Sequence, residues 1–202
     1  ISELGNLRRS HFSDEISSSM NGDEVTVMGW VLTIRGHGNI SFATLRDKNG
    51  DISIIAKKGD CPDEIREKIS SLKSHSSIAV IGKVKSSDKA PGGFEIIPTE
   101  LRVFSEVEKI PPFEPTVKTV KNIETRLEVR PIDLRRDALQ HIFKIRSLVL
   151  KSIRDYFTDQ KFLEINTPKM IATATEGGAA LFPIFYYNKE AFLAQSPQLY
   201  KE

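Results

Sequence analysis

The order of strand-like and helix-like segments in the first half of the chain constrains the fold more than any other feature. Five segments are dense in β-branched and large apolar residues, with the partial alternation typical of strands. They cover residues 25–34, 40–46, 51–56, 77–85 and 94–104. Between the third and fourth, residues 62–72 carry Ile65, Ile69 and Leu72 at helical spacing behind Pro62. The predicted order is therefore three strands, one helix and two strands.

Two turn signals separate the first three predicted strands. The sequence Gly36-His37-Gly38-Asn39 follows the first strand, and Asp47-Lys48-Asn49-Gly50 joins the second to the third. An Asn-Gly pair between two strand-like segments is the strongest short-range signal for a β-hairpin. The second and third strands are therefore expected to be antiparallel neighbours.

This order of elements is the one expected of an OB-fold, a five-stranded barrel that binds oligonucleotides across its second and third strands. Phe42 lies on the second strand, with Arg35 before it and Arg46 after it. A base stacked on an aromatic ring contributes about 1 to 3 kcal/mol, and cations hold the phosphates. The alternative is that Phe42 is an ordinary core residue and that both arginines are solvated.

Charge and cysteine usage narrow the function classes. The 29 basic and 27 acidic residues nearly balance, so nucleic-acid contact should come from a local patch. Cys61 is the single cysteine, which excludes an internal disulfide, and no Cys/His cluster has metal-ligand spacing. No apolar run approaches the roughly 20 residues that span a bilayer. We therefore expect a cytoplasmic protein with no metal site in this chain.

A proline-containing segment divides the chain. Three prolines between Glu108 and Thr119 are incompatible with a continuous helix or central strand. The expected organisation is a barrel domain at residues 1–106, a hinge at 107–130 and the start of a second domain at 131–202. In the second domain, Asp133 is expected to cap a long helix with a wide apolar stripe. The stripe comprises Ala138, Leu139, Ile142, Phe143, Ile145, Val149, Ile153, Tyr156 and Phe157.

Residues after the helix are expected to add strands to the second domain. Residues 162–168 alternate as a short strand that ends at Pro168, and residues 191–194 are strand-like. A polar loop, Thr173-Ala174-Thr175-Glu176-Gly177-Gly178, lies between them. About seventy residues of this kind are unlikely to close a core, so we expect the natural protein to continue beyond Glu202.

Several of these segments resemble class II aminoacyl-tRNA synthetases. The helix leading into Lys161-Phe162-Leu163-Glu164-Ile165-Asn166-Thr167-Pro168 is similar to motif 1 of that class, and Asp133-Leu134-Arg135-Arg136 is similar to the start of the catalytic domain in the aspartate, asparagine and lysine subgroup. The strongest match is the pair of segments 171–178 and 192–201. Together they resemble the amino-acid pocket of archaeal/eukaryotic-type aspartyl-tRNA synthetases, and the likeness runs from about Arg9 to Glu202.

The resemblance implies an OB-fold barrel followed by the start of an α+β class II catalytic domain, an antiparallel sheet with helices. In that reading Glu176 binds the ammonium of aspartate, Gln198 hydrogen-bonds the substrate, and Lys201 pairs with its side-chain carboxylate. A buried lysine rejects the neutral amide of asparagine because the cation would be left without its counter-ion. The related asparagine enzymes carry serine at the position of Pro197 and lack the lysine, so both residues select aspartate.

The same resemblance assigns the barrel to the tRNA anticodon. It places Phe42 at the base-stacking position, with Glu95 and Arg35 among the anticodon-binding residues. Two departures from the usual pattern are Ser53, where most relatives have a glutamine that helps to read the anticodon, and Ala179-Ala180, where Thr-Glu is common.

In this family, the residues at the positions of Pro91 and Leu32 relate to which tRNA is charged. Proline at the position of Pro91 accompanies enzymes that accept both tRNA(Asp) and tRNA(Asn), whereas Leu32 fits neither usual pattern.

The implied reaction is formation of aspartyl-adenylate from L-aspartate and ATP, with Mg²⁺, followed by transfer to tRNA in a homodimer built through motif 1. We find no Arg-x-Glu motif that follows a strand and no glycine-rich segment ending in Glu-Arg, the two motifs that bind ATP in this class. We therefore expect motifs 2 and 3 beyond Glu202, no catalytic residue or metal ligand within this chain, and no activity from the 202 residues alone.

Two alternatives remain open from the sequence. The chain could be a non-catalytic OB-fold module that binds tRNA or single strands, although Glu176 and Lys201 would then have no use. It could also be a truncated synthetase paralogue that makes asparagine as a free metabolite. Such a paralogue would lack the barrel, so the OB-fold pattern disfavours it. The downstream reading frame would separate an enzyme from a binding module.

Overall fold

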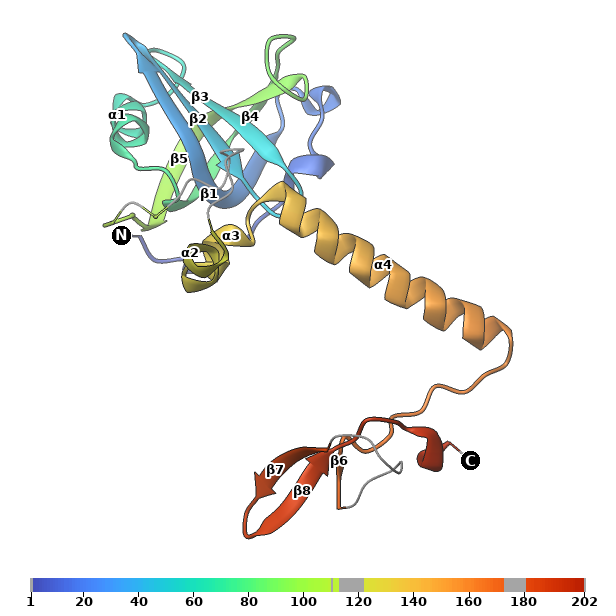
Figure 1. The fold of residues 1–202 in the computed structure, drawn as a ribbon. Helices are drawn as coiled ribbons and strands as arrows, with labels where there is room; N and C mark the ends of the chain where they lie inside the picture. Colours follow the sequence, from blue (N-terminus) through green and yellow to red (C-terminus); the bar gives the residue numbers. More distant parts are fainter. Residues whose placement is uncertain (1, 110, 113–121, 173–180, 202) are drawn as a thin grey trace. The chain divides into compact units, whose positions relative to one another are not determined.

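The computed structural model describes residues 2–109, 111–112, 122–172 and 181–201. The chain divides into two compact units, Ile1–Pro111 and Pro112–Glu202. Each unit is described by itself, and Figure 1 follows their elements along the chain. The division falls inside the segment expected to be the hinge, of which residues 113–121 lie outside the described part of the chain.

The first unit is a closed five-stranded barrel with the predicted order of elements. Its elements are β1 (Glu24–His37), β2 (Ile40–Arg46), β3 (Asp51–Lys57), α1 (Asp63–Ser71), β4 (Ser77–Ser86) and β5 (Phe94–Ser105). The strands close in the order β1-β2-β3-β5-β4, with β4 pairing back to β1. All pairs are antiparallel except β3 with β5, which are parallel at Ile54 and Ile96. Two short 3-10 helices, η1 (Ser13–Glu15) and η2 (Ser18–Met20), precede the barrel.

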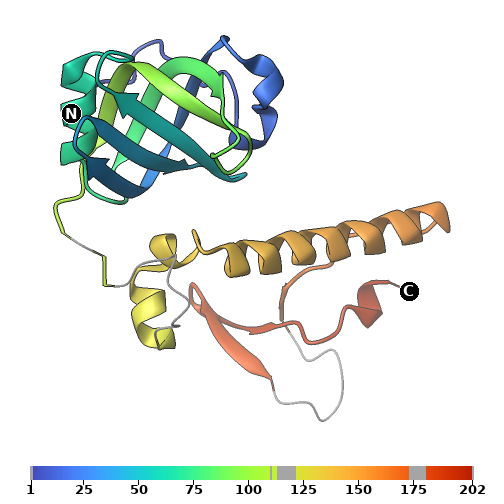
Figure 2. The same ribbon diagram turned by 90° about the horizontal axis from the view of Figure 1, so that it is seen from above.

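The barrel interior is filled by alternate residues of every strand. Ile69 and Leu72 bring the end of α1 into the same core, so the helix packs against the barrel (Figure 2). The seventeen core residues are Ile16, Val25, Val27, Val31, Ala43, Leu45, Ile52, Ile54, Ala56, Ile69, Leu72, Ile78, Val80, Val84, Phe94, Ile96 and Val103. Their burial gives the first unit a hydrophobic core of its own.

The first turn is tighter than its sequence predicts. We expected residues 36–39 to form the turn, but Gly36 and His37 continue β1 and pair with Ser41 and Ile40. The turn itself is Gly38-Asn39, and Gly38 has a φ of +58°, where glycine is favoured. The longer β1 extends the outer surface of the sheet by two residues.

The second turn is built around a buried carboxylate. Asp47, whose side chain is 1% exposed, accepts hydrogen bonds from the backbone amides of Asn49 (2.8 Å) and Gly50 (3.0 Å). It also accepts from the amide and the hydroxyl of Ser13, both at 2.7 Å. Burial raises the pKa of Asp47, but these hydrogen bonds outweigh it, so the pKa lies below its ordinary value. Asp47 thereby ties the N-terminal segment to the β2–β3 hairpin.

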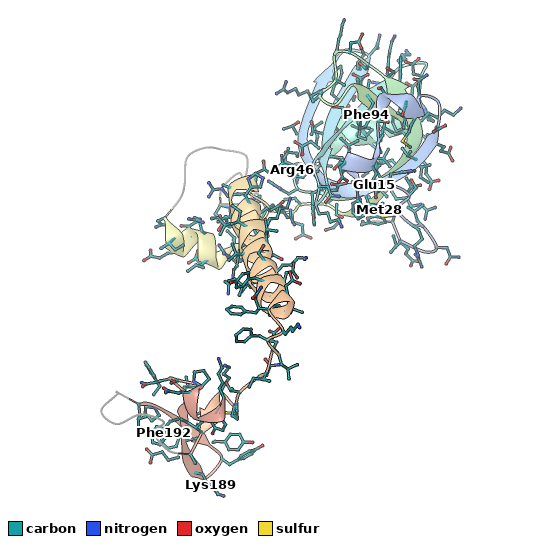
Figure 3. The ribbon with its side chains drawn as sticks, turned by 90° about the vertical axis from the view of Figure 1, so that its right-hand side faces the viewer. Glu15, Met28, Arg46, Phe94, Lys189 and Phe192 are labelled. Atoms are coloured by element: carbon teal, nitrogen blue, oxygen red, sulfur yellow. The ribbon has the colours of Figure 1, made fainter. Side chains whose placement is uncertain are left out.

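The second unit contains one long helix, short helices and a small sheet. Its elements are α2 (Ile123–Glu128), α3 (Arg130–Asp133), α4 (Asp137–Asp159), β6 (Met170–Ile171), β7 (Phe182–Tyr186), β8 (Lys189–Leu193) and the 3-10 helix η3 (Gln198–Tyr200). The sheet is antiparallel with the order β6-β8-β7. Lys189 and Phe192 mark β8 in Figure 3. The strand expected at residues 191–194 is confirmed, whereas β7 was not foreseen.

Two expectations for the second unit were wrong. Asp133 does not cap the long helix, because it ends α3 and is buried among Arg126, Arg130 and Arg136, with its nearest contact at 2.7 Å from Arg130. Burial raises the pKa of Asp133, but hydrogen bonds and charge from Arg126 and the other two arginines outweigh it and lower the pKa. Residues 162–168 also form no strand. Their alternation has no neighbouring strand to pair with among the described residues.

The apolar stripe of α4 is exposed. No residue of this helix is buried within the described chain, and its large apolar side chains are 45% to 63% exposed. These side chains are Ile142, Phe143, Ile145, Leu148, Val149, Leu150, Ile153, Tyr156 and Phe157. No described residue buries the stripe. None of the described helices combines the length and apolar character needed to cross a membrane.

Candidate nucleic-acid interface

Phe42 lies on the outer face of the barrel. Along β2, Ser41, Ala43 and Leu45 are buried, so the strand's two-residue period turns Phe42 outward, where its side chain is 39% exposed. The alternative that Phe42 is a core residue is therefore wrong. An exposed phenylalanine on this strand is available to stack against a ligand.

The neighbouring strands place defined partners beside Phe42. In the sheet register Arg35 of β1 and Ile55 of β3 lie directly across from it on either side. The next row on the same face consists of Thr33, Thr44 and Ser53, and the Thr33 hydroxyl donates to that of Thr44 at 3.0 Å. The face thus combines one aromatic ring, one guanidinium and a row of small hydroxyl side chains.

A groove of about 880 Å³ runs over this face and reaches the loop between β4 and β5. Glu95 enters it from β5, opposite Lys85 of β4 in the strand register. Its cations are Arg35, Lys57, Lys85 and Lys89, against the two carboxylates Asp60 and Glu95. Although the whole chain is nearly neutral, the groove carries an excess of positive charge, as phosphate binding requires.

The groove gathers most of the anticodon residues expected from the sequence. Arg35, Phe42, Ser53, Pro91 and Glu95 all line it, although they come from four strands and a loop. Closure of the barrel brings β5 beside β3 and so unites residues that are up to sixty positions apart. This convergence is the main geometric feature of the first unit.

Two expected residues do not line the groove. Leu32 sits at an irregularity in β1, where the register to β2 skips from Val31 to Thr33. Arg46 lies at the periphery of the barrel (Figure 3), where its guanidinium makes two bonds to the Asp51 carboxylate, at 2.6 and 2.9 Å. The expected pair of cations flanking Phe42 is therefore wrong for Arg46.

The sequence did not single out Lys57, Lys85 and Lys89, which provide the other groove cations. Lys57 is the last residue of β3, Lys85 is the last but one of β4, and Lys89 belongs to the β4–β5 loop. Placing them requires the pairing of β3 with β5. A lysine near a strand end is otherwise typical of any solvated edge.

The expected aspartate pocket is described only in part. Gln198 begins η3 and Lys201 follows it, with the Lys201 amide donating to the Gln198 carbonyl at 3.0 Å. Both side chains are exposed, and the backbone N–H of Gln198 donates to the Ser196 hydroxyl at 3.2 Å. Glu176 and Ala179-Ala180 lie outside the described residues. The role of these three pocket residues stays a prediction.

Within the described residues, no group of three or more His, Cys, Asp or Glu side chains is placed to hold a metal ion. Cys61 packs beside the barrel core, and burial raises the pKa of its thiol.

Both units match known protein families. Residues 25–104 match the family described as "OB-fold nucleic acid binding domain", and residues 122–202 match "tRNA synthetases class II (D, K and N)". The first match coincides with the barrel strands and the second with the unit that contains α4.

Curated relatives extend the likeness along the chain. The aspartate–tRNA(Asp/Asn) ligase of Methanothermobacter thermautotrophicus is 51% identical over 199 residues, which is 98% of this chain and 46% of the relative. The ligase of the same name from Methanocaldococcus jannaschii is 49% identical over 96% of this chain and 44% of the relative. The chain thus spans slightly less than half the length of these relatives.

Solved structures agree with the two-unit fold. Asparaginyl-tRNA synthetase from Pyrococcus horikoshii, complexed with asparaginyl-adenylate, has a TM-score of 0.85 at 30% identity, over 96% of this chain and 44% of that one. A structure titled as a putative aspartyl-tRNA synthetase from Leishmania major Friedlin has a TM-score of 0.84 at 27% identity, over 100% and 41% of the two chains. The barrel topology and these matches together show an OB-fold nucleic-acid-binding domain followed by part of a class II tRNA synthetase domain of the D, K and N group, in a chain that is similar over nearly its whole length to aspartate–tRNA(Asp/Asn) ligases.

Proposed function

We propose that the full-length protein attaches L-aspartate to tRNA and that this chain supplies its anticodon-binding domain and the beginning of its catalytic domain. The observation that carries the proposal is the groove on the barrel, where an exposed Phe42 lies beside Arg35 and which Glu95 also lines. The names of the relatives, aspartate–tRNA(Asp/Asn) ligases, supply the substrate.

The groove chemistry suits a short single strand. Phe42 offers a flat apolar surface for one base, and the surrounding cations neutralise phosphates. Glu95 is a hydrogen-bond acceptor, so it favours a base that presents an N–H donor and disfavours one that presents only acceptors. In this proposal stacking provides affinity, and Glu95 provides choice among bases.

For the amino acid, we propose that Glu176, Gln198 and Lys201 form one wall of the pocket. Aspartate presents an ammonium, which needs an anion, and a side-chain carboxylate, which needs a fixed cation. Glu176 and Lys201 have those charges, and Gln198 can donate or accept a hydrogen bond. The signs of the charges and the family match support this assignment.

The remaining substrates belong to the full-length enzyme. ATP and Mg²⁺ are its other requirements, and we assign no ligand for either to the described residues. Activation of a carboxylate by ATP relies on positioning and on stabilisation of charge by cations. We propose that the reaction takes place in the cytoplasm, where tRNA is charged for translation.

We also propose that the exposed stripe of α4 is covered by a second copy of the protein. A helix with an apolar arc this wide is stable in water only when the arc is buried against another surface. The match of this unit to the class II synthetases supports dimerisation through the same helix.

The proposal extends to tRNA(Asn). Pro91 lines the groove beside the anticodon-binding residues, and both relatives described above are named for the two tRNAs. Leu32 does not line the groove, so we assign the tolerance of the second tRNA to the loop that contains Pro91.

Charging assays with the full-length protein and the two purified tRNAs test the function. We expect aspartate to be attached to both tRNAs, and use of tRNA(Asp) alone would refute the wider specificity. Lys201→Ala should abolish aspartate-dependent pyrophosphate exchange and leave tRNA affinity unchanged, whereas Phe42→Ala should raise the KM for tRNA and leave exchange unchanged. Binding of tRNA with no charging by the unaltered protein would favour the binding-module alternative.

A further inference from the structure

The irregularity at Leu32 changes which residues of β1 face outward. Before it, the odd-numbered residues Val25, Val27 and Val31 are buried, so the even-numbered Trp30 faces out. After it, the odd-numbered Thr33 and Arg35 are the exposed ones. An unpaired residue of this kind is a β-bulge, which re-aims side chains next to a functional surface. The bulge therefore places Trp30 on the same face as Arg35.

Trp30 begins a third row on the face that carries Phe42. It pairs with Arg46, which in turn pairs with Asp51 of β3. Trp30 is 37% exposed, close to the 39% of Phe42. Because Phe42 and Arg46 are four residues apart on one strand, the two aromatic rows lie about 13 Å from each other. Only the small side chains of Thr33, Thr44 and Ser53 lie between these rows.

A second hollow of about 530 Å³ opens beside Trp30, and none of its lining residues lines the groove. Its walls are mainly apolar and include Leu4, Phe12 and Met28. Two cations, Arg9 and Lys48, line the hollow. The Arg9 guanidinium lies 4.4 Å and the Lys48 ammonium 4.1 Å from the centroid of the Phe12 ring. The one carboxylate that lines the hollow, Asp47, is buried, accepts four hydrogen bonds and forms an ion pair with Arg9 at 3.8 Å.

The cations of this hollow differ in their freedom to move. Arg9 is held by a 2.6 Å hydrogen bond from its guanidinium to the Met28 carbonyl. Lys48 is exposed on the β2–β3 turn, and its long side chain can follow a phosphate. A flat apolar surface with positive charge at its rim has the same chemistry as the groove around Phe42.

We propose that the hollow beside Trp30 is a second nucleotide site for the same RNA strand. An RNA strand whose triplet occupies the groove continues over the small side chains of Thr33, Thr44 and Ser53. The base of a flanking nucleotide then stacks on Trp30. Lys48 neutralises the adjoining phosphate. This inference rests on the proposed anticodon function, because it takes the groove as the place where the triplet binds.

Trp30 is the single tryptophan of the chain, so its fluorescence reports on the hollow alone. The 202-residue chain would be titrated with a seven-nucleotide RNA of the anticodon loop, labelled at one end so that anisotropy measures binding independently. The control RNA keeps the triplet and every phosphate but lacks the four flanking bases. We expect the complete loop RNA to quench Trp30, because a stacked base contacts the indole, and the abasic control to bind without quenching.

Variants give a second readout. Trp30→Ala should weaken binding of the complete RNA about tenfold and leave binding of the abasic control unchanged, since only one stacked base is removed. Trp30→Phe, which keeps a flat ring, should restore most of the affinity. Lys48→Ala should weaken binding of both RNAs, whereas Lys73→Ala, an exposed lysine outside the hollow and the groove, should alter neither.

The outcomes separate the two proposals. Binding of the complete RNA without quenching, or equal affinities of Trp30→Ala and the unaltered chain, would overturn the second site and leave the groove intact. Failure of the unaltered chain to bind either RNA would overturn the anticodon function itself, and the second site with it.

Discussion

The two units of the chain bury their apolar residues to very different degrees. The barrel encloses seventeen buried apolar residues, whereas Ile171 is the single buried apolar side chain of the second unit within the described residues. Nine large apolar side chains of α4 are 45% to 63% exposed. The apolar residues of the barrel strands are thus buried within the first unit, whereas the apolar stripe of α4 stays exposed in the second.

This difference shows what an amphipathic pattern does and does not specify. Alternation along the barrel strands determines which residues face inward, because the closed sheet is itself the partner of each strand. The stripe of α4 determines only that one side of the helix must be covered. No described contact of this chain covers the stripe. Variants of the barrel core and of the α4 stripe can therefore test the two units separately.

The largest effect is expected from crowding the barrel. A Cβ atom added at Gly29 would overlap the carbonyl oxygen of Arg46 on the neighbouring strand, so Gly29→Ala must displace backbone. We expect a loss of about 3 kcal/mol in the free energy of unfolding. Gly36→Ala is the matched control on the same strand, because no atom lies within 4 Å of the added carbon.

Hydrogen exchange on the whole chain checks this prediction residue by residue. Protection should fall across the barrel in Gly29→Ala and remain unchanged in α4 and in the β6-β8-β7 sheet. A parallel loss of protection in both units would contradict the separation of the two cores.

The next effect concerns the stripe of α4. Val149 lies near the centre of the apolar arc, so Val149→Glu would bury a charge in the proposed dimer interface. We expect the dimer of the full-length protein to dissociate at concentrations at least about a hundredfold higher. Ser147→Glu, on the polar side between Lys144 and Lys151, should leave the dimer intact. Sedimentation equilibrium measures both, and equal dissociation constants would refute the assignment of this face.

A smaller effect is expected at the buried carboxylate of the barrel. Asp47→Asn should cost about 2 kcal/mol, because it replaces a charged acceptor of four hydrogen bonds by a neutral one. The pKa of Asp47 is lower in the folded chain than its ordinary value of 3.8. Its stabilising contribution is therefore fully present above pH 3.8 and is lost as the pH falls through the folded-state pKa.

Urea unfolding of the barrel between pH 3 and pH 7 measures this contribution. The difference in stability between the unaltered chain and Asp47→Asn should shrink as the pH falls, whereas exposed Asp23→Asn should show no difference at any pH. A difference that stays constant with pH would mean that the charge of Asp47 is not the source of the stabilisation.

The smallest effect is expected at the groove cations. Lys85 lines the groove, and Lys83, two residues earlier on the same strand, is exposed but does not. Lys85→Ala should weaken RNA binding a few-fold and lower the slope of log affinity against log salt by about 1. Lys83→Ala should change neither quantity. Identical slopes for the two variants would mean that Lys85 does not contact an RNA phosphate.

Local sequence predicted the barrel well because its strands and turns are specified over short distances. The hairpin at Asn49-Gly50 and the helix ending near Ser71 needed only neighbouring residues. The outward position of Phe42 followed once the buried partners Ser41 and Ala43 were known. The bulge at Leu32 left no signal in the local pattern, and it is the feature that places Trp30 and Arg35 on the same face.

The second unit was harder to predict because side-chain contacts and the lack of a neighbouring strand outweighed the local sequence pattern. Asp133 is of a residue type that often caps helices, yet Arg126 and Arg130 hold it as a buried anion at the end of α3. Residues 162–168 have the alternation of a strand but no neighbouring strand among the described residues. For the aspartate pocket, the family resemblance supplied the roles of Gln198 and Lys201, and Glu176 lies outside the described residues.

The most direct test of the account compares two tRNA anticodon stem-loops that differ only in their triplet. The 202-residue chain should bind the aspartate stem-loop at least about tenfold more tightly than one with an unrelated triplet, and Phe42→Ala should lose about tenfold in affinity for the aspartate stem-loop. Equal affinity of the unaltered chain for both stem-loops, with Phe42→Ala indistinguishable from it, would contradict the assignment of the groove to the anticodon.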